Sequence, residues 1–205
     1  LERSEIRILQ ETSFRDDATR IMRAIKYEKR FGMFLEKKTK ALLTSDLSML
    51  DTIVGYRLRK ELKLWFEETQ CADILVRASD LGVIKALDDG INKGIEFIRN
   101  TGYLERHKVE SEKFWLSLIA YFMDYDECSH FITRFGFRGG LAKTIIDTNR
   151  LKCRADLLRF MNKANLQFQE DLDRYDHTIL RVMGLINRNN IVGEQIDMHL
   201  SRTKP

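Results

Sequence analysis

Hydrophobic residues recur every three to four positions along most of the chain, which is the spacing of one face of an α-helix. The clearest helix is predicted to begin at Ser13, because Ser13 and Asp16 have the spacing of a capping box, and to end at Gly32. Its apolar face consists of Ala18, Ile21, Met22 and Ile25. Further helices are predicted at 37–43, 53–70, 71–81, 92–101, 111–121, 128–135, 141–149, 155–166, 172–186 and 192–199.

The fold class follows from what interrupts this pattern. No stretch alternates apolar and polar residues for long enough to predict a β-strand. The one proline is the last residue, Pro205, and the chain is rich in Leu, Lys, Arg and Glu, which favour helices. We therefore predict an all-α, multi-helical fold. We divide it near residue 105 into two helical regions, 1–105 and 106–205.

Composition excludes several classes of protein. No apolar run approaches the roughly 20 residues that span a bilayer, so we expect no membrane partner, and the first ten residues are too charged for a signal peptide. Three widely spaced cysteines suit a reducing cytoplasm, and neither they nor the four histidines have metal-ligand spacing. We expect no metal site in this chain. The net charge of +4 allows nucleic-acid binding without predicting it.

The polar face of the first helix has two interpretations. Asp16, Arg20, Arg23, Tyr27 and Arg30 lie opposite the apolar face, and Asp17 lies on the flank one turn before Arg20. Such a face is ordinary for a solvated helix with i,i+4 ion pairs. It also suits nucleotides, because carboxylates accept from base amino groups, arginines donate to ring nitrogens or phosphates, and tyrosine stacks. Spacing alone leaves both interpretations open.

The helix predicted at 53–70 has charge on its apolar side. Glu61 lies among the apolar residues, and Arg57 lies one turn earlier at their edge. A buried carboxylate is costly unless it is paired, and Arg57 is the natural i,i+4 partner of Glu61. Glu61 is therefore either partly wet at a helix crossing or part of an ion pair that braces a neighbouring polar site. The apolar side is marked by Val54, Leu58, Leu62 and Trp65.

Both helices resemble consecutive motifs of class II tRNA nucleotidyltransferases and bacterial poly(A) polymerases. Residues 13–27, SFRDDATRIMRAIKY, resemble the family's S-F-x-[DE]-D-P-x-R-[IL]-x-R-A-x-R-[FY]. Phe31-Gly32-Met33, Glu36 and Thr39 are similar to L-G-F-x-[IL]-x-x-x-T. Residues 53–62, IVGYRLRKEL, resemble [IV]-S-x-E-R-[IL]-R-x-E-L, and residues 81–84, LGVI, resemble L-G-[VIL]-L. The resemblance covers about residues 6–87.

The resemblance implies the neck and body of this family, which follow a head domain that binds Mg²⁺ and transfers nucleotides. It implies that Asp17 and Arg20 face the Watson–Crick edge of CTP or ATP. The nucleotide-binding set would be Asp17, Arg20, Asp16, Arg23 and Tyr27, braced by Arg57, Glu61 and Arg59. Three departures bear on nucleotide specificity: Ala18 stands where proline is frequent, Lys26 replaces arginine, and residues 54–56 lack the family's Ser and Glu.

The motifs of the catalytic head are not found in this sequence. No G-G-x-x-R-D loop precedes Ser13, and no Asp-x-Asp pair with metal-binding surroundings does. Asp124-Tyr125-Asp126 lies far downstream between predicted helices. We therefore expect no catalytic residue and no cofactor in this chain, with Mg²⁺ bound by the head. The chain alone should be inactive.

Residues 143–163 form a basic region that is either an ordinary exposed helix pair or an RNA contact. The RNA-binding candidates are Lys143, Arg150, Lys152 and Arg154. The combined prediction is a chain that selects CTP or ATP and holds a tRNA or other RNA 3′ end, for CCA or poly(A) addition. The alternative is a helical RNA-binding or protein-interaction module without nucleotide recognition. A third possibility is a structural domain whose resemblance is only ancestral.

Overall fold

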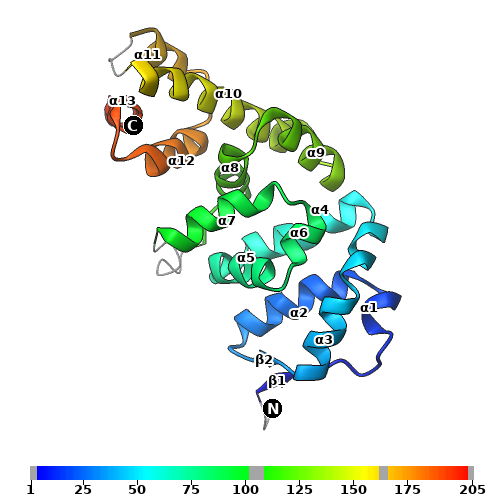
Figure 1. Cartoon of the computed structure of the whole chain (residues 1–205). Helices are drawn as coiled ribbons and strands as arrows, with labels where there is room; N and C mark the ends of the chain where they lie inside the picture. Colours follow the sequence, from blue (N-terminus) through cyan, green and yellow to red (C-terminus); the bar gives the residue numbers. More distant parts are fainter. Residues whose placement is uncertain (1–3, 102–108, 162–165, 203–205) are drawn as a thin grey trace.

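The computed structural model describes residues 4–101, 109–161 and 166–202 of the 205-residue chain. Its helices follow one another in an elongated, curved array, with α1–α3 at one end and α11–α13 at the other (Figure 1). The multi-helical, all-α class predicted from the sequence is confirmed. None of the described helices is both long and apolar enough to cross a membrane.

The single helix predicted at 13–32 is two helices. They are α1 (Ser13–Asp16) and α2 (Thr19–Arg30), and Asp17 between them has extended backbone angles, φ −151° and ψ 98°. The predicted capping box is wrong, because Ser13 lies inside α1 and Asp16 accepts instead from the hydroxyl of Thr12 at 2.9 Å. The predicted apolar face, Ala18, Ile21, Met22 and Ile25, is buried as expected.

The prediction of no strand is also wrong. Two short strands, β1 (Glu5–Ile6) and β2 (Phe34–Leu35), pair in parallel with Glu5 opposite Phe34 and Ile6 opposite Leu35. Two residues are too few to produce an alternating pattern, so the sequence has no signal for them. This pairing holds the N-terminal segment against the loop after α2, beside α3 (Lys37–Ser45).

The second motif forms a helix that lies across α2. After the 3₁₀ helix η1 (Leu47–Thr52), α4 covers Gly55–Phe66 and buries Leu58, Leu62 and Trp65. Val54 was expected on this buried side, but it precedes the helix and is 57% exposed. The Trp65 indole N–H donates to the Met22 carbonyl at 3.0 Å and so fixes the crossing of α4 with α2. The next helices are α5 (Cys71–Asp80), α6 (Val83–Leu87) and α7 (Ile91–Asn100).

The helices of the C-terminal region differ from the prediction in their bounds. The helices predicted at 141–149 and 155–166 are one continuous helix as far as described, α10 (Gly139–Met161). The helix predicted at 172–186 is wrong at its start, because the chain turns after α11 and Asp176 caps α12 through the Thr178 amide at 2.8 Å. The other helices here are α8 (Glu112–Phe122), α9 (Tyr125–Phe135), α11 (Leu166–Leu172), α12 (His177–Asn187) and α13 (Ile191–Arg202).

Two apolar clusters form the core. The larger one includes residues from Phe14 to Phe137 together with Ile145 and Val182, so it lies on both sides of residue 105. The smaller one is built around α10–α13, with Leu151, Leu172 and Ile196 fully buried. The division of the chain near residue 105 stays a prediction.

The start of α4 lies against the end of α9, as Figure 1 shows. A Cβ atom on Gly55 would lie 2.7 Å from the Arg134 carbonyl oxygen, closer than side chains tolerate. Arg134 in turn donates to the carbonyls of Ile53 at 3.0 Å and Leu50 at 2.7 Å. Glycine at position 55 is therefore required by this helix contact.

We predict that Gly55→Ala lowers the free energy of unfolding by about 1–3 kcal/mol, because the two backbones must move apart. Gly140→Ala is the matched control, since that glycine is also close to a helix N-terminus but has no atom within 4 Å of the position that a Cβ would occupy. Urea denaturation of both variants measures the difference. Equal stability of the two variants would contradict the close contact.

Candidate functional site

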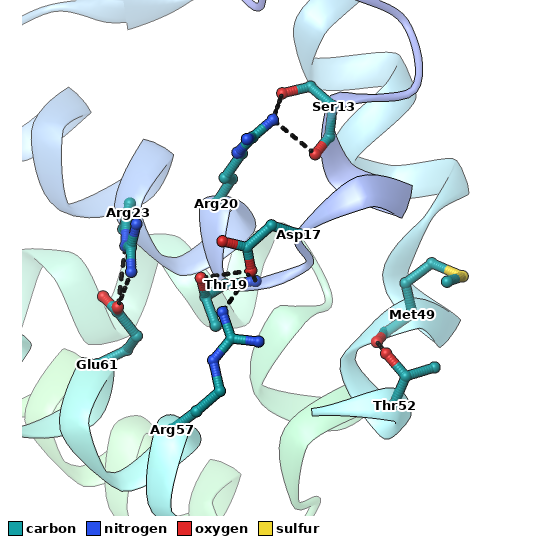
Figure 2. Close-up of polar contacts among 9 residues, drawn as sticks. All are labelled: Ser13, Asp17, Thr19, Arg20, Arg23, Met49, Thr52, Arg57 and Glu61. Atoms are coloured by element: carbon teal, nitrogen blue, oxygen red, sulfur yellow. Dashed lines mark hydrogen bonds and ion pairs between the residues drawn. The ribbon is translucent and has the colours of Figure 1, made fainter. Parts of the chain in front are cut away.

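Asp17, at the break between α1 and α2, is the centre of the polar cluster in Figure 2. Its Oδ1 atom accepts from the Thr19 amide at 3.1 Å, from the Thr19 hydroxyl at 2.7 Å and from Arg57 Nη2 at 2.9 Å. Among the described residues, none donates a hydrogen bond to Oδ2. One carboxylate oxygen is thus fixed by the fold, and the other keeps its acceptor capacity.

The charge of Asp17 is set by the same contacts. Partial burial raises the pKa of the carboxyl, but the hydrogen bonds from Thr19 and the contact with Arg57 lower it by more. The net effect holds the pKa of Asp17 below its ordinary value of 3.8. Asp17 is therefore ionised at neutral pH, and Oδ2 is a charged acceptor.

Arg20 is the second residue of α2, and its side chain reaches back to α1. Its Nη1 atom donates to Ser13 Oγ at 2.9 Å and to the Ser13 carbonyl at 3.3 Å. In the part of the chain that the structure describes, its Nε and Nη2 donors have no acceptor. Figure 2 shows Arg20 and Asp17 close to each other, with Arg20 bonded to Ser13 and Asp17 bonded to Thr19 and Arg57. The two side chains therefore offer an anionic acceptor beside cationic donors.

The second helix contributes the supporting charges in a different pairing from the one predicted. The expected Arg57–Glu61 pair is wrong, because Arg57 contacts Asp17, whereas Glu61 Oε1 accepts from Arg23 Nε at 2.9 Å and Nη2 at 2.6 Å. Glu61 is only 3% exposed and forms an ion pair with the 44% exposed Arg23, so the ion pair, one of its two interpretations, is the one observed. The crossing of α2 and α4 brings these long-range partners closer than the i,i+4 neighbour.

Three predicted site residues lie outside this cluster. Asp16 is exposed and bonded to Thr12, and Arg59 donates to the Gly136 carbonyl at 2.5 Å. Tyr27 stacks on Phe31 with ring centroids 5.7 Å apart. The sequence interpretation missed Ser13 as an acceptor for Arg20 and Thr19 as a donor to Asp17. Ser13 was noticed only as a helix cap, and Thr19 was not singled out at all.

The basic candidates of α10 separate into two faces. Lys143 and Arg150 both lie near Asp147, and Arg154 pairs with Asp171. These three side chains remain 70%, 69% and 47% exposed and follow one another along one side of the helix.

Lys152 points elsewhere. Its Nζ atom donates to the Met123 carbonyl at 3.1 Å and lies 6.0 Å from the centre of the Tyr121 ring. It therefore ties α10 to the end of α8 and is less available to a ligand than the other three basic residues.

No metal centre is evident in the described part of the chain, where no group of three His, Cys, Asp or Glu side chains could hold an ion. The downstream Asp124-Tyr125-Asp126 is the start of α9, where Asp124 and Glu127 form a capping box. The Mg²⁺ expected for a head domain is accordingly not assigned to any residue here.

Comparisons with known proteins point in one direction. No protein-family model matches the sequence. An A-adding tRNA nucleotidyltransferase of Geobacter sulfurreducens is 36% identical over 87 residues, a match that covers 42% of this chain and 10% of that protein. A solved CCA-adding enzyme bound to ATP superposes with a TM-score of 0.73 and 25% identity, over 98% of this chain and 50% of that one.

A solved tRNA nucleotidyltransferase bound to a primer tRNA and an ATP analogue has the same fold, with a TM-score of 0.69 and 20% identity. It matches over 98% of this chain and 62% of that chain. The chain thus spans about half to three fifths of the solved chains that it matches.

The lowered pKa of Asp17 predicts a pH dependence. Because the folded-state pKa lies below the unfolded one, the stabilisation from this carboxylate is present above pH 3.8 and is lost as pH falls through the folded-state pKa. We expect Asp17→Asn to be less stable than the parent at about pH 7 and equally stable in strong acid. Thermal melting of both proteins between about pH 7 and pH 2 measures this. A stability difference that persists unchanged in acid would contradict the proposed charge.

Proposed function

Because this chain belongs to the class II tRNA nucleotidyltransferase family, we propose that it forms the helical neck and body that select CTP or ATP. In this proposal it also holds the RNA 3′ end, while a head domain outside this sequence transfers the nucleotide. The observation that carries the proposal is that Asp17 and Arg20 are close together and each keeps unused hydrogen-bonding atoms. These are Oδ2 of Asp17 and the Nε and Nη2 donors of Arg20, which have no partner among the described residues.

The chemistry of this pair favours two of the four bases. Cytosine and adenine each present an exocyclic amino donor next to a ring-nitrogen acceptor on the Watson–Crick edge. An ionised Asp17 accepts from the amino group, and Arg20 donates to the ring nitrogen. Uracil and guanine present a carbonyl where the amino group would be, so Asp17 would face a second acceptor. Such an unpaired polar contact gives strong discrimination.

Contacts with neighbouring residues hold Asp17 and Arg20 in place without a bound nucleotide. Thr19 and Arg57 hold one Asp17 oxygen, Ser13 holds one end of Arg20, and the Arg23–Glu61 pair locks α2 onto α4. Ordering that is already present in the free protein reduces the entropy lost on binding. In this proposal Arg57 and Glu61 are positioning residues, and Arg23 serves the crossing of the helices more than the base.

The proposal assigns the phosphoryl chemistry elsewhere. Two-metal transfer needs convergent carboxylates next to the nucleotide phosphates, and we place these in the head domain with its Mg²⁺. The chain alone should therefore bind nucleotide and RNA without extending the RNA. The coding sequence before Leu1 provides a direct test, because a preceding region without paired metal-binding carboxylates would remove the enzyme interpretation.

We predict that Asp17→Asn and Arg20→Met, each in the full-length protein, lower kcat/KM for ATP and CTP by about 10- to 100-fold relative to GTP and UTP. Each variant loses a hydrogen bond that involves a charged group, which is worth about 1.5–3 kcal/mol. Single-turnover extension of a tRNA primer with each of the four nucleotides measures the preference.

Asp80→Asn is the matched control, because Asp80 is an exposed carboxylate paired with Arg99 on helices outside the site. Unchanged base preference in both site variants would favour the alternative, a helical module without nucleotide recognition.

If α10 holds RNA, one substitution on this helix should strengthen tRNA binding. Asp147 neutralises Lys143 and Arg150, so Asp147→Asn frees two cations for phosphates and should raise tRNA affinity. Arg150→Gln should weaken binding and make the slope of log affinity against log salt shallower by about 1. A salt series of tRNA binding measures both. A flat salt dependence in the parent chain would contradict phosphate contacts by this helix.

A further inference from the structure

An exposed surface beside the candidate nucleotide site has no assigned role. It consists of Tyr56 and Lys60 on α4 and Arg138 in the link between α9 and α10, and we call it the Tyr56 surface. Tyr56 is 64% exposed, and both cations are exposed. Among the described residues, none forms a hydrogen bond or ion pair with the side chains of these three residues.

The fold brings these residues together. Tyr56 and Lys60 are one helical turn apart and share a face of α4. Arg59, the residue before Lys60, donates to the Gly136 carbonyl at 2.5 Å and so holds the α9–α10 link against α4. A Cβ atom on Gly136 would lie 3.8 Å from the Tyr56 amide nitrogen, and Arg138 follows two residues later. The Tyr56 surface is therefore built by the same contact that requires glycine at position 55.

The chemistry of this surface fits RNA better than protein. An exposed aromatic ring offers a stacking face to a nucleobase, and the unpaired cations Lys60 and Arg138 attract the phosphates. Tyrosine and arginine also occur often in protein interfaces, but lysine is depleted there, so the unpaired Lys60 favours a phosphate over a protein partner.

The Tyr56 surface lies where the proposed function needs an RNA contact, and the inference rests on that proposed function. Tyr56 immediately precedes Arg57, the residue that holds Asp17. An RNA end that receives a nucleotide must lie beside that nucleotide. The family motif that residues 53–62 resemble has glutamate at the position of Tyr56. A carboxylate at that position would repel a phosphate.

We propose that the Tyr56 surface is a binding subsite for single-stranded RNA, in which a base near the RNA 3′ end stacks on Tyr56. Lys60 and Arg138 bind the phosphates that flank this base. The subsite is specific to this chain's departure from the family motif and adds a stacking contact to the backbone contacts proposed for α10.

The test is a binding titration of the 205-residue chain with a fluorescein-labelled single-stranded RNA of about eight nucleotides. We expect Tyr56→Leu to weaken binding by about 5- to 100-fold, and Tyr56→Phe to keep most of the affinity because it keeps the ring. Lys60→Gln and Arg138→Gln should each make the salt slope shallower by about 0.7.

Tyr125→Leu is the matched control, because Tyr125 is 65% exposed at the start of another helix, α9. Unchanged affinity in Tyr56→Leu, or an equal loss in Tyr125→Leu, overturns the proposal. So does sedimentation that shows a dimer in the parent chain and a monomer in Tyr56→Leu, because the surface would then bind a second copy.

Nucleotide binding to the same variants separates this inference from the proposed function. Calorimetry with ATP should show a loss in Asp17→Asn and none in Tyr56→Leu. If ATP binding depends on Asp17 but RNA binding is independent of Tyr56, only the subsite is wrong. If RNA binding depends on Tyr56 but ATP binding is unchanged in Asp17→Asn, the nucleotide role fails and the subsite stands as a general single-stranded RNA site.

Discussion

The crossing of α2 and α4 is the constraint on which the candidate site depends. One acidic and one basic residue come from each side of the crossing, and both ion pairs join the two sides. Asp17 before α2 pairs with Arg57 on α4, and Arg23 on α2 pairs with Glu61 on α4. The Trp65 bond to the Met22 carbonyl fixes the same crossing from within the core. Because Glu61 is almost completely buried, loss of its partner would leave an uncompensated charge in the interior. The pairing therefore makes the register of the two helices specific.

This constraint explains why a short break in a helix matters. Asp17 leaves the helical conformation, which allows its carboxylate to cap the start of α2 and to reach Arg57 in one arrangement. Arg20 is tied to Ser13 across the same break. The open oxygen of Asp17 and the open donors of Arg20 are thus presented by groups whose own partners are already in place, which is the preorganisation that base discrimination needs.

The elements that we propose to contact RNA, the Tyr56 surface and α10, adjoin the crossing of α2 and α4 through α9. The close approach of α4 to α9, which requires Gly55, places the Tyr56 surface next to the candidate nucleotide site and near the start of α10. On α10, Asp147 limits the free positive charge, because Lys143 and Arg150 share it as a partner. In the function that we propose, this neutralisation moderates the attraction of α10 for RNA phosphates.

The sequence by itself determined the helical class, the buried face of α2 and the order of the motifs, because these depend on residue types and on spacing within one segment. It left two interpretations of Glu61 open, a partly wet carboxylate or an ion pair, and the structure shows the ion pair. It could not identify the partner. Neighbours at i and i+4 are visible in a sequence, whereas Arg23 and Glu61 are 38 positions apart and meet only when α2 crosses α4. The tertiary structure likewise decided the break at Asp17, the role of Thr19 and the place of Tyr56 beside Gly136. Each depends on a contact between segments that are separate along the chain, or on a local bend that such contacts stabilise.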